Sequence, residues 1–246
     1  MKFVAEFAAS LCTALFAGAS LYINLVEHPA RTECGTALAA TEFAPSYRRA
    51  TVMQVSLAVI GLVAAMWAWW LHAGFEWLVG GILLGAVVPF TLVFIFPTNN
   101  RILDPSLDRN SEVARTLLKR WGRLHAVRTT LSLAALLILL AAMAAAAVKQ
   151  DDLRAKEAEL RRDLFTLRDL ISQDTLNMQK APQSLDDLKT AGYLHDIPED
   201  PFTGEANWEP HQEDSLMAVD QQEPGIDDVH SASHRIASDG SAYSSW

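Results

Sequence analysis

The segment TTLSLAALLILLAAMAAAAV, residues 129–148, contains twenty residues without a charge and lies between Arg128 and Lys149. At about 1.5 Å of rise per residue, a helix of this length spans roughly 30 Å, the thickness of the hydrocarbon core of a bilayer. The segment is therefore predicted to be a transmembrane helix.

The flanking sequence extends this helix. Residues 111–128 contain no proline, and residues 149–173 contain neither glycine nor proline. In the second stretch, large apolar residues recur at helical spacing: Leu153, Leu160, Leu164, Leu167 and Ile171. We predict that the span at 129–148 continues into the long helix of a water-soluble domain.

The two parts of the chain differ in charge. Residues 1–150 carry 12 Lys and Arg against 8 Asp and Glu, whereas residues 151–246 carry 8 against 21, which gives the total of −9. The acidic part argues against nucleic acid as a partner, because phosphate binding requires a basic surface. Cys12 and Cys34 are the two cysteines, and their positions indicate neither a disulfide framework nor a thiolate metal site.

Further uncharged runs predict a membrane domain at 1–148, embedded in lipid, and a soluble domain at 149–246. The spans are expected at about 4–26, 51–73, 77–97 and 129–148. The first run also resembles a signal peptide, with Lys2 as its basic end and 17–19 as its cleavage site. Cleavage would export the two most basic loops, so we interpret the run as an uncleaved helix.

The second and third spans form a predicted helical hairpin. Gly81 and Gly85 are a pair of small residues that allows close helix approach, and Pro89 is expected to kink the third span. Tryptophan side chains at the ends of the hairpin fit an interfacial belt: Trp67, Trp69, Trp70 and Trp77.

The distribution of basic residues predicts the orientation. The segments 27–49 and 99–128 together contain ten Lys and Arg, so the positive-inside rule makes both cytoplasmic. Both termini then lie on the opposite face. In a bacterial cell, this describes a multi-pass inner-membrane protein with a periplasmic acidic domain.

Polar clusters at the cytoplasmic span ends supply the candidate site. They occur in VEHPAR (26–31), FPTNNRILDP (96–105) and RWGRLHAVRT (120–129), where Pro29 disfavours helical geometry at His28. Ionisable groups at the mouth of an apolar bundle are costly and often functional. The candidates are Glu27, His28, Asn99, Asn100, Arg120, Trp121, His125 and Arg128.

An alternative interpretation of these clusters is structural. Glu27 would pair with an arginine, the asparagines would cap a helix end, and the arginines would follow the positive-inside rule. Two histidines and a carboxylate also suit a metal, but the spacings match no metal motif.

With SYRRATVMQ (46–54), these motifs resemble the anthrone oxygenase-like family of four-helix membrane proteins, most of which have no assigned function. The resemblance covers about residues 4–148. It implies a cofactor-independent monooxygenase that oxidises a hydrophobic aromatic anthrone to an anthraquinone. Carried over to this chain, His28 or His125 would be the base. Asn99, Asn100 and Arg128 would stabilise the developing oxyanion.

The acidic part is predicted to be a small α+β domain. A short helix is expected at 184–191, and strands near 206–211, 215–220 and 226–230. The core is small, so the long helix is expected to pack across the sheet.

Several segments of this part resemble the globular domain of the type II secretion major pseudopilin, a type IV pilin-like protein. They are RRDLFTLRDLISQ (161–173), KAPQSLDDL (180–188), AGYLHDIPEDPFTG (191–204), VDQQEPGIDDVHSAS (219–233) and SDGSAYSSW (238–246). The resemblance implies a pilin-like fold and secretion-system or pilin-like partners. In that family the long helix begins with a Gly-Phe-Thr-Leu-Ile-Glu type start, and the span at 129–148 stands in its place here.

The pilin-like resemblance also implies a calcium site in the C-terminal loop. Its ligands would be Asp227, Asp228, Asp239 and Ser241, whose oxygens suit a hard cation. Ordinary turn chemistry is the alternative explanation for these residues.

Three hypotheses for function follow from these observations. The protein is an oxygenase-like membrane module with a periplasmic appendage, a structural component of a secretion system with a multi-span anchor, or a gene fusion whose halves have no joint role.

Overall fold

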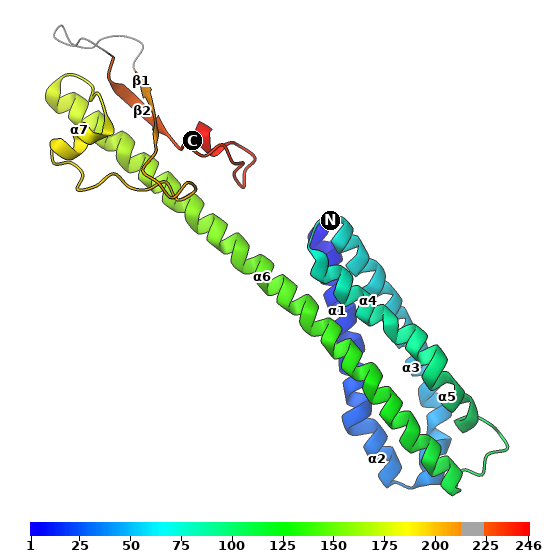
Figure 1. The fold of residues 1–246 in the computed structure, drawn as a ribbon. Coiled ribbons are helices and arrows are strands. Elements are labelled where there is room, and N and C mark those ends of the chain that lie inside the picture. The colour runs from blue at the N-terminus through cyan, green and yellow to red at the C-terminus, as the bar shows by residue number, and fades with distance from the viewer. Residues whose placement is uncertain (213–223) are drawn as a thin grey trace. The chain divides into compact units, whose positions relative to one another are not determined.

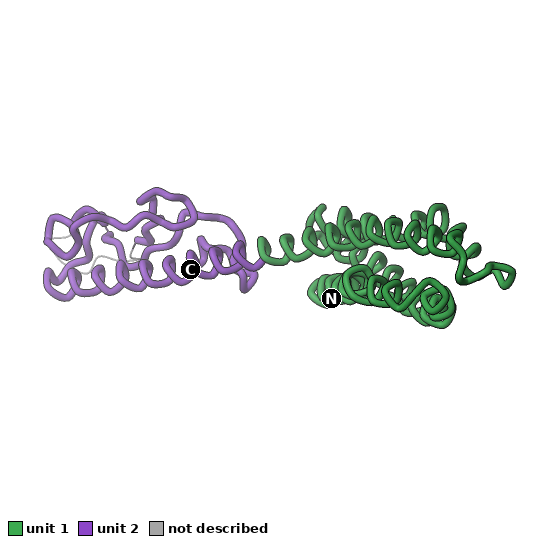
Figure 2. The backbone as a smooth tube through the Cα atoms, turned by 90° about the horizontal axis from the view of Figure 1, so that it is seen from below, with its two compact units in different colours: residues 1–146 green, residues 147–246 purple. Residues whose placement is uncertain are grey.

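The computed structural model describes residues 1–212 and 224–246 (Figure 1). Contacts divide the chain into two compact units, Met1–Ala146 and Ala147–Trp246 (Figure 2). The strand expected near 215–220 lies outside the described residues.

Unit 1 is helical. Its elements are α1 (Lys2–Tyr22), η1 (Ile23–Glu27), α2 (His28–Glu33), α3 (Thr36–Trp70), α4 (Phe75–Phe90), η2 (Thr91–Ile95), α5 (Phe96–Ile102) and the first part of α6 (Glu112–Met178). Four helical runs in the described chain are long and apolar enough to cross a membrane: Lys2–Glu33, Thr36–Trp70, Phe75–Ile102 and Glu112–Met178. The prediction of a mostly helical protein with several long apolar helices is confirmed.

Both the first and the third helical run continue through a proline, although Pro29 was expected to end the first. Both η1 and η2 are π-helical turns, and each stands just before a proline. The N–H of His28 bonds to the carbonyl of Ile23, five residues back, and Phe96 bonds in the same way to Thr91. The wider turn makes room for the proline ring that follows, so the helix continues.

The expected end of a helix at His28 is therefore wrong, because His28 has helical dihedral angles of −67° and −44°. The segment 27–49, expected as a loop, is also largely helical. Helix α3 begins at Thr36 and runs through Pro45.

Small residues bring the helices of unit 1 together, as the glycine pair predicted. A Cβ atom on Gly81 would lie 2.8 Å from the Cβ of Ala65, and one on Gly80 would lie 2.5 Å from Leu139. Trp77 is 1% exposed and packs in this core, so it does not belong to the interfacial belt. The other three hairpin tryptophans are exposed, as expected.

Unit 2 packs one face of α6 against a small sheet and its loops. Strands β1 (Glu209–Gln212) and β2 (Ile226–His230) are antiparallel, and Glu209 pairs with His230. The short helix α7 (Leu185–Thr190) falls within the predicted range, and the Asp187 carboxylate accepts the N–H of Ser184 to close its first turn. The described part of unit 2 therefore contains both helix and sheet.

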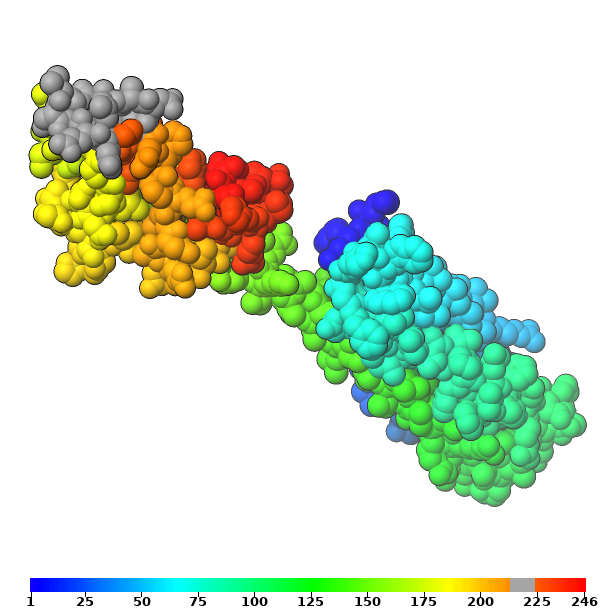
Figure 3. All heavy atoms as spheres, turned by 45° about the horizontal axis from the view of Figure 1, so that its top comes forward, coloured from blue at the N-terminus to red at the C-terminus, as the bar shows by residue number. Residues whose placement is uncertain are grey.

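The core of unit 2 is formed by the apolar stripe of α6 together with residues from the rest of the unit. Its fully or nearly buried members are Leu160, Leu164, Leu167, Ile171, Leu188, Trp208, Ile226, Val229, Ala237 and Tyr243. The C-terminal segment, red in Figure 3, packs against the orange region that precedes it. Four of the five helical positions expected to carry the core, all except Leu153, are found there.

Candidate functional site

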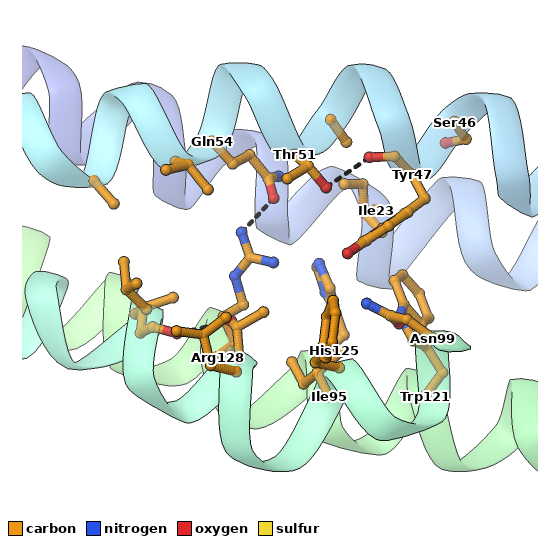
Figure 4. Close-up of a pocket in the computed structure, with 18 of the residues that line it drawn as sticks. Ile23, Ser46, Tyr47, Thr51, Gln54, Ile95, Asn99, Trp121, His125 and Arg128 are labelled. Atoms are coloured by element: carbon orange, nitrogen blue, oxygen red, sulfur yellow. Dashed lines mark hydrogen bonds between the residues drawn. The ribbon is translucent and has the colours of Figure 1, made fainter. Parts of the chain in front are cut away.

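Unit 1 contains a cavity of about 210 Å³ among its helices (Figure 4). Its walls come from α1, η1, α2, α3, α4, η2, α5 and α6. Most lining residues are apolar, and the polar or aromatic ones used below are Tyr47, Thr51, Gln54, Asn99, Trp121, His125 and Arg128. The cavity is thus an apolar chamber with a few polar groups, as small-molecule sites generally are.

His125 is the central ionisable group of this cavity. Its side chain projects from α6 toward the α3 wall that carries Tyr47 (Figure 4), and it is 2% exposed. The Nδ1 atom lies 2.5 Å from Oδ1 of Asn24, and the ring stacks on Trp121 with 4.7 Å between centroids. Because an amide oxygen can only accept, this contact places the proton on Nδ1 and leaves a lone pair on Nε2.

Arg128 lies one turn further along α6. Its guanidinium donates to Oε1 of Gln54 and lies 4.8 Å from the centroid of the Phe16 ring. The Nε atom of Arg128 and the Nε2 atom of Gln54 are buried and have no hydrogen-bond partner within 1–212 and 224–246. Both groups therefore retain unused donors beside the cavity.

Asn99 is the least satisfied polar residue of the site. It is 1% exposed, and neither its amide oxygen nor its amide nitrogen has a partner in the described chain. Figure 4 shows its side chain on the α5 wall, facing Tyr47. A buried polar group without a partner costs about 1–3 kcal/mol, so such a residue calls for an explanation, which a bound polar ligand would supply.

Glu27 and His28 lie beside the cavity and do not line it. Glu27 forms an ion pair with Arg31 and accepts the hydroxyl of Ser46 at 3.0 Å. Arg31 also contacts Glu42 at 3.1 Å. The structural interpretation of Glu27, pairing with an arginine, matches this arrangement.

His28 packs against Trp121, with 5.1 Å between ring centroids. Its imidazole fills the space that a side chain at Gly122 would occupy, because a Cβ there would lie 2.6 Å from Nε2 of His28. His28 therefore supports the aromatic wall of the cavity from behind.

Two other candidates point elsewhere. Asn100 and Arg120 are exposed and do not contribute to the cavity wall, whereas their neighbours Asn99 and Trp121 do. The reason is helical geometry, since consecutive residues differ by about 100° around the axis.

Three residues of the candidate site were not predicted from the sequence. Tyr47 and Gln54 line the cavity from α3, and Asn24 holds His125 from η1. Tyr47, Thr51 and Gln54 stand at i, i+4 and i+7 within SYRRATVMQ, so their common helical face was the available signal. Asn24 had a weaker signal, as the sole amide in the first uncharged run.

The four expected calcium ligands already have protein partners. Asp228 pairs with Arg168 at 2.5 Å, and Asp227 lies 2.7 Å from Nδ1 of His211. Asp239 accepts both the backbone N–H (2.9 Å) and the hydroxyl (2.6 Å) of Ser241. Arg161 also lies 3.9 Å from Asp239.

These residues do not fit a calcium site as they are placed. Calcium takes six to eight oxygen ligands, and here basic side chains occupy the surroundings of the carboxylates. Among residues 1–212 and 224–246, no group of three or more His, Cys, Asp or Glu is arranged to hold a metal ion.

Comparison with known proteins gives one family. The family model described as anthrone oxygenase matches residues 43–138, a segment that includes the α3, α5 and α6 walls of the cavity. Searches of curated proteins and of solved structures gave no match. The match supports the resemblance of the membrane part, and no comparison bears on residues 139–246.

Proposed function

We propose that unit 1 is a cofactor-independent oxygenase that converts the activated ring CH₂ of a hydrophobic aromatic ketone, such as an anthrone, to a carbonyl. The observation that carries this proposal is the fixed imidazole of His125, whose Nδ1 is held by Asn24 at 2.5 Å. The name of the matching family supports the choice of substrate.

His125 acts as the general base. Its Nε2 removes one proton from the CH₂ group, and the carbanion that forms is delocalised onto the ketone oxygen. The carbanion reduces O₂ and forms a C–O bond, and the imidazolium returns the proton to give a hydroperoxide.

The second half of the reaction completes the balance. His125 removes the remaining proton on the same carbon, the O–O bond breaks, and the hydroxide that leaves takes that proton as water. One atom of O₂ enters the new carbonyl and the other becomes water. The carbon loses four electrons and O₂ gains four.

The unpartnered donors stabilise the intermediate. Charge develops on the ketone oxygen when the proton is removed, and the Asn99 amide and the Arg128 guanidinium present donors beside the cavity. Preorganised donors in a dry site contribute strongly to catalysis, typically about 10²–10³-fold for one donor. These two residues take the role that the resemblance implied, and Asn100 does not share it.

The test is oxidation of anthrone by membranes that contain the protein, with anthraquinone measured under O₂. His125→Ala is expected to abolish quinone formation. Arg120→Ala is the matched control, because Arg120 lies on the same helix and is exposed. Full activity of His125→Ala in correctly inserted protein would refute the assignment.

For unit 2 we propose a pilin-like fold, in which the fourth span of the membrane part continues as the long helix. The packing of Leu164 and Leu167 against Ile226 and Val229 of β2 supports this proposal. In a bacterial inner membrane, the basic segments of unit 1 would face the cytoplasm and both termini the periplasm.

A further inference from the structure

Three residues of the cavity wall also lie on the outer surface of unit 1. Val55 in α3 is 46% exposed, Leu92 in η2 is 59% exposed, and Phe96 in α5 is 42% exposed. All three belong to helical runs that are long and apolar enough to lie in the bilayer. The cavity therefore reaches the surface between α3 and the η2–α5 segment, at membrane depth.

The end of the cavity near the expected cytoplasmic face is closed. Arg31, 8% exposed, lines the cavity there and is held by Glu27 and Glu42. Phe43 meets Trp121 edge to face beside it, with 5.4 Å between centroids. A ligand entering from the water on that side would have to separate the buried Arg31 guanidinium from its two carboxylate partners, which is costly because it leaves that buried charge unpaired.

The opposite end is filled by packed side chains. Phe16, Ala58, Leu84 and Ala135 form a buried cluster there, and Leu84 leaves no room for a Cβ on Gly61, at 2.6 Å. Of the directions out of the cavity, the side that faces the acyl chains is the one bordered by exposed apolar residues.

We propose that the ligand enters this cavity sideways from the hydrocarbon phase, through an entrance bordered by Val55, Leu92 and Phe96. The ligand class is an uncharged aromatic compound dissolved in the bilayer. It carries oxygen substituents that satisfy Asn99 and the Gln54–Arg128 pair. The choice of probes below rests on the proposed function.

The experiment uses the full-length protein in phosphatidylcholine vesicles and compares two probes with the same ring system. Anthraquinone dissolves in the bilayer, whereas anthraquinone-2-sulfonate is a permanent anion that stays in water. Binding is measured as specific quenching of protein tryptophan fluorescence, because Trp121 lines the cavity. Anthraquinone is expected to bind, and the sulfonate, added to either side, is expected not to compete.

Substitutions at the rim of the entrance, which Val55, Leu92 and Phe96 form, test where the entrance lies. Val55→Phe and Leu92→Phe narrow it and are expected to weaken anthraquinone binding about tenfold or more. The matched controls, Val59→Phe and Val93→Phe, stand on the same elements, are 47% and 63% exposed, and do not line the cavity, so they should bind as the wild type does. Leu92→Ala widens the rim and should preserve binding, which separates blockage from misfolding.

Each outcome bears on the proposal. Competition by the sulfonate would place the entrance on an aqueous face, and equal binding by rim and control variants would remove it from the α3 side. Absence of anthraquinone binding would overturn the ligand class. Binding without any oxidation of anthrone would refute the oxygenase function and leave the lateral entrance standing.

Discussion

Replacement of Asn24 by leucine tests whether the orientation of His125 determines catalysis. In the wild type, Oδ1 of Asn24 accepts the Nδ1 proton at 2.5 Å, in a site where the imidazole is 2% exposed. Leucine has a similar size and no acceptor. The imidazole then loses the contact that keeps Nε2 free to act as the base.

The size of the effect follows from the buried donor. Leaving a buried N–H without an acceptor costs about 1–3 kcal/mol, which corresponds to a factor of roughly 5 to 150 in an equilibrium constant. This penalty destabilises the tautomer of His125 that carries its proton on Nδ1 and has Nε2 free to act as the base. The rate of quinone formation should therefore decrease by about one to two orders of magnitude. Outer-shell partners of functional histidines at metal sites have effects of similar size, about 10–100-fold.

The assay is kcat for anthrone oxidation in membranes with equal amounts of inserted protein. Asn24→Asp keeps an acceptor at the same place and should restore most of the rate. Asn100→Leu is the matched control, since this exposed amide lies outside the cavity. Wild-type kcat in Asn24→Leu, together with loss of activity in His125→Ala, would show that the contact with Asn24 is not needed to orient the base.

Three further predictions concern the fold. Gly81→Leu should destabilise unit 1 by about 1–3 kcal/mol, because a Cβ at this position would lie 2.8 Å from a side chain of α3. Thermal unfolding of the protein in detergent measures this loss, and an unchanged unfolding midpoint would contradict the close packing. Burial, and then the hydrogen bond to Glu157, raise the pKa of Tyr243 to about 12. Because the pKa of Tyr243 in the folded protein lies above its unfolded value of 10.0, the stability that the neutral phenol contributes to unit 2 is complete below pH 10 and is lost as the pH rises toward 12. The urea concentration at the unfolding midpoint should therefore fall between these pH values, and it should fall less in Tyr243→Phe. A reporter fused after Trp246 should be active only if it functions in the periplasm, and activity of a cytoplasmic reporter there would reverse the proposed orientation.

Much of the fold was readable from the sequence because the membrane imposes a length and a composition on whatever crosses it. A run of twenty uncharged residues such as 129–148 has few alternatives to a spanning helix. The apolar stripe at Leu160, Leu164, Leu167 and Ile171 similarly identified the buried face of α6, which is the face found in the core of unit 2. Helical periodicity is a local property, so neither result required knowledge of the partners.

Local rules failed where the backbone departs from regular geometry. Proline next to His28 predicted a helix end, but the π turn at Ile23–Glu27 lets the helix continue. Trp77 was placed at the interface by its position near a span end, and it is instead buried among small residues. The first outcome depends on a local change in the backbone hydrogen-bond pattern. The second depends on contacts with helices that are remote in the sequence.

For the candidate site, too, some features follow from local helical spacing and others depend on how the helices pack. Helical spacing alone predicts that Trp121, His125 and Arg128 share one face of α6, because positions i, i+4 and i+7 always do. The packing of the helices in the folded protein was needed to see that this face meets Tyr47 and Gln54 of α3 across a cavity, with Asn99 on a third wall and Asn100 outside. The spacing of residues fixes which of them lie on a common helical face, whereas the rotation of each helix, set by close contacts such as that of Gly80 with Leu139, fixes which faces meet.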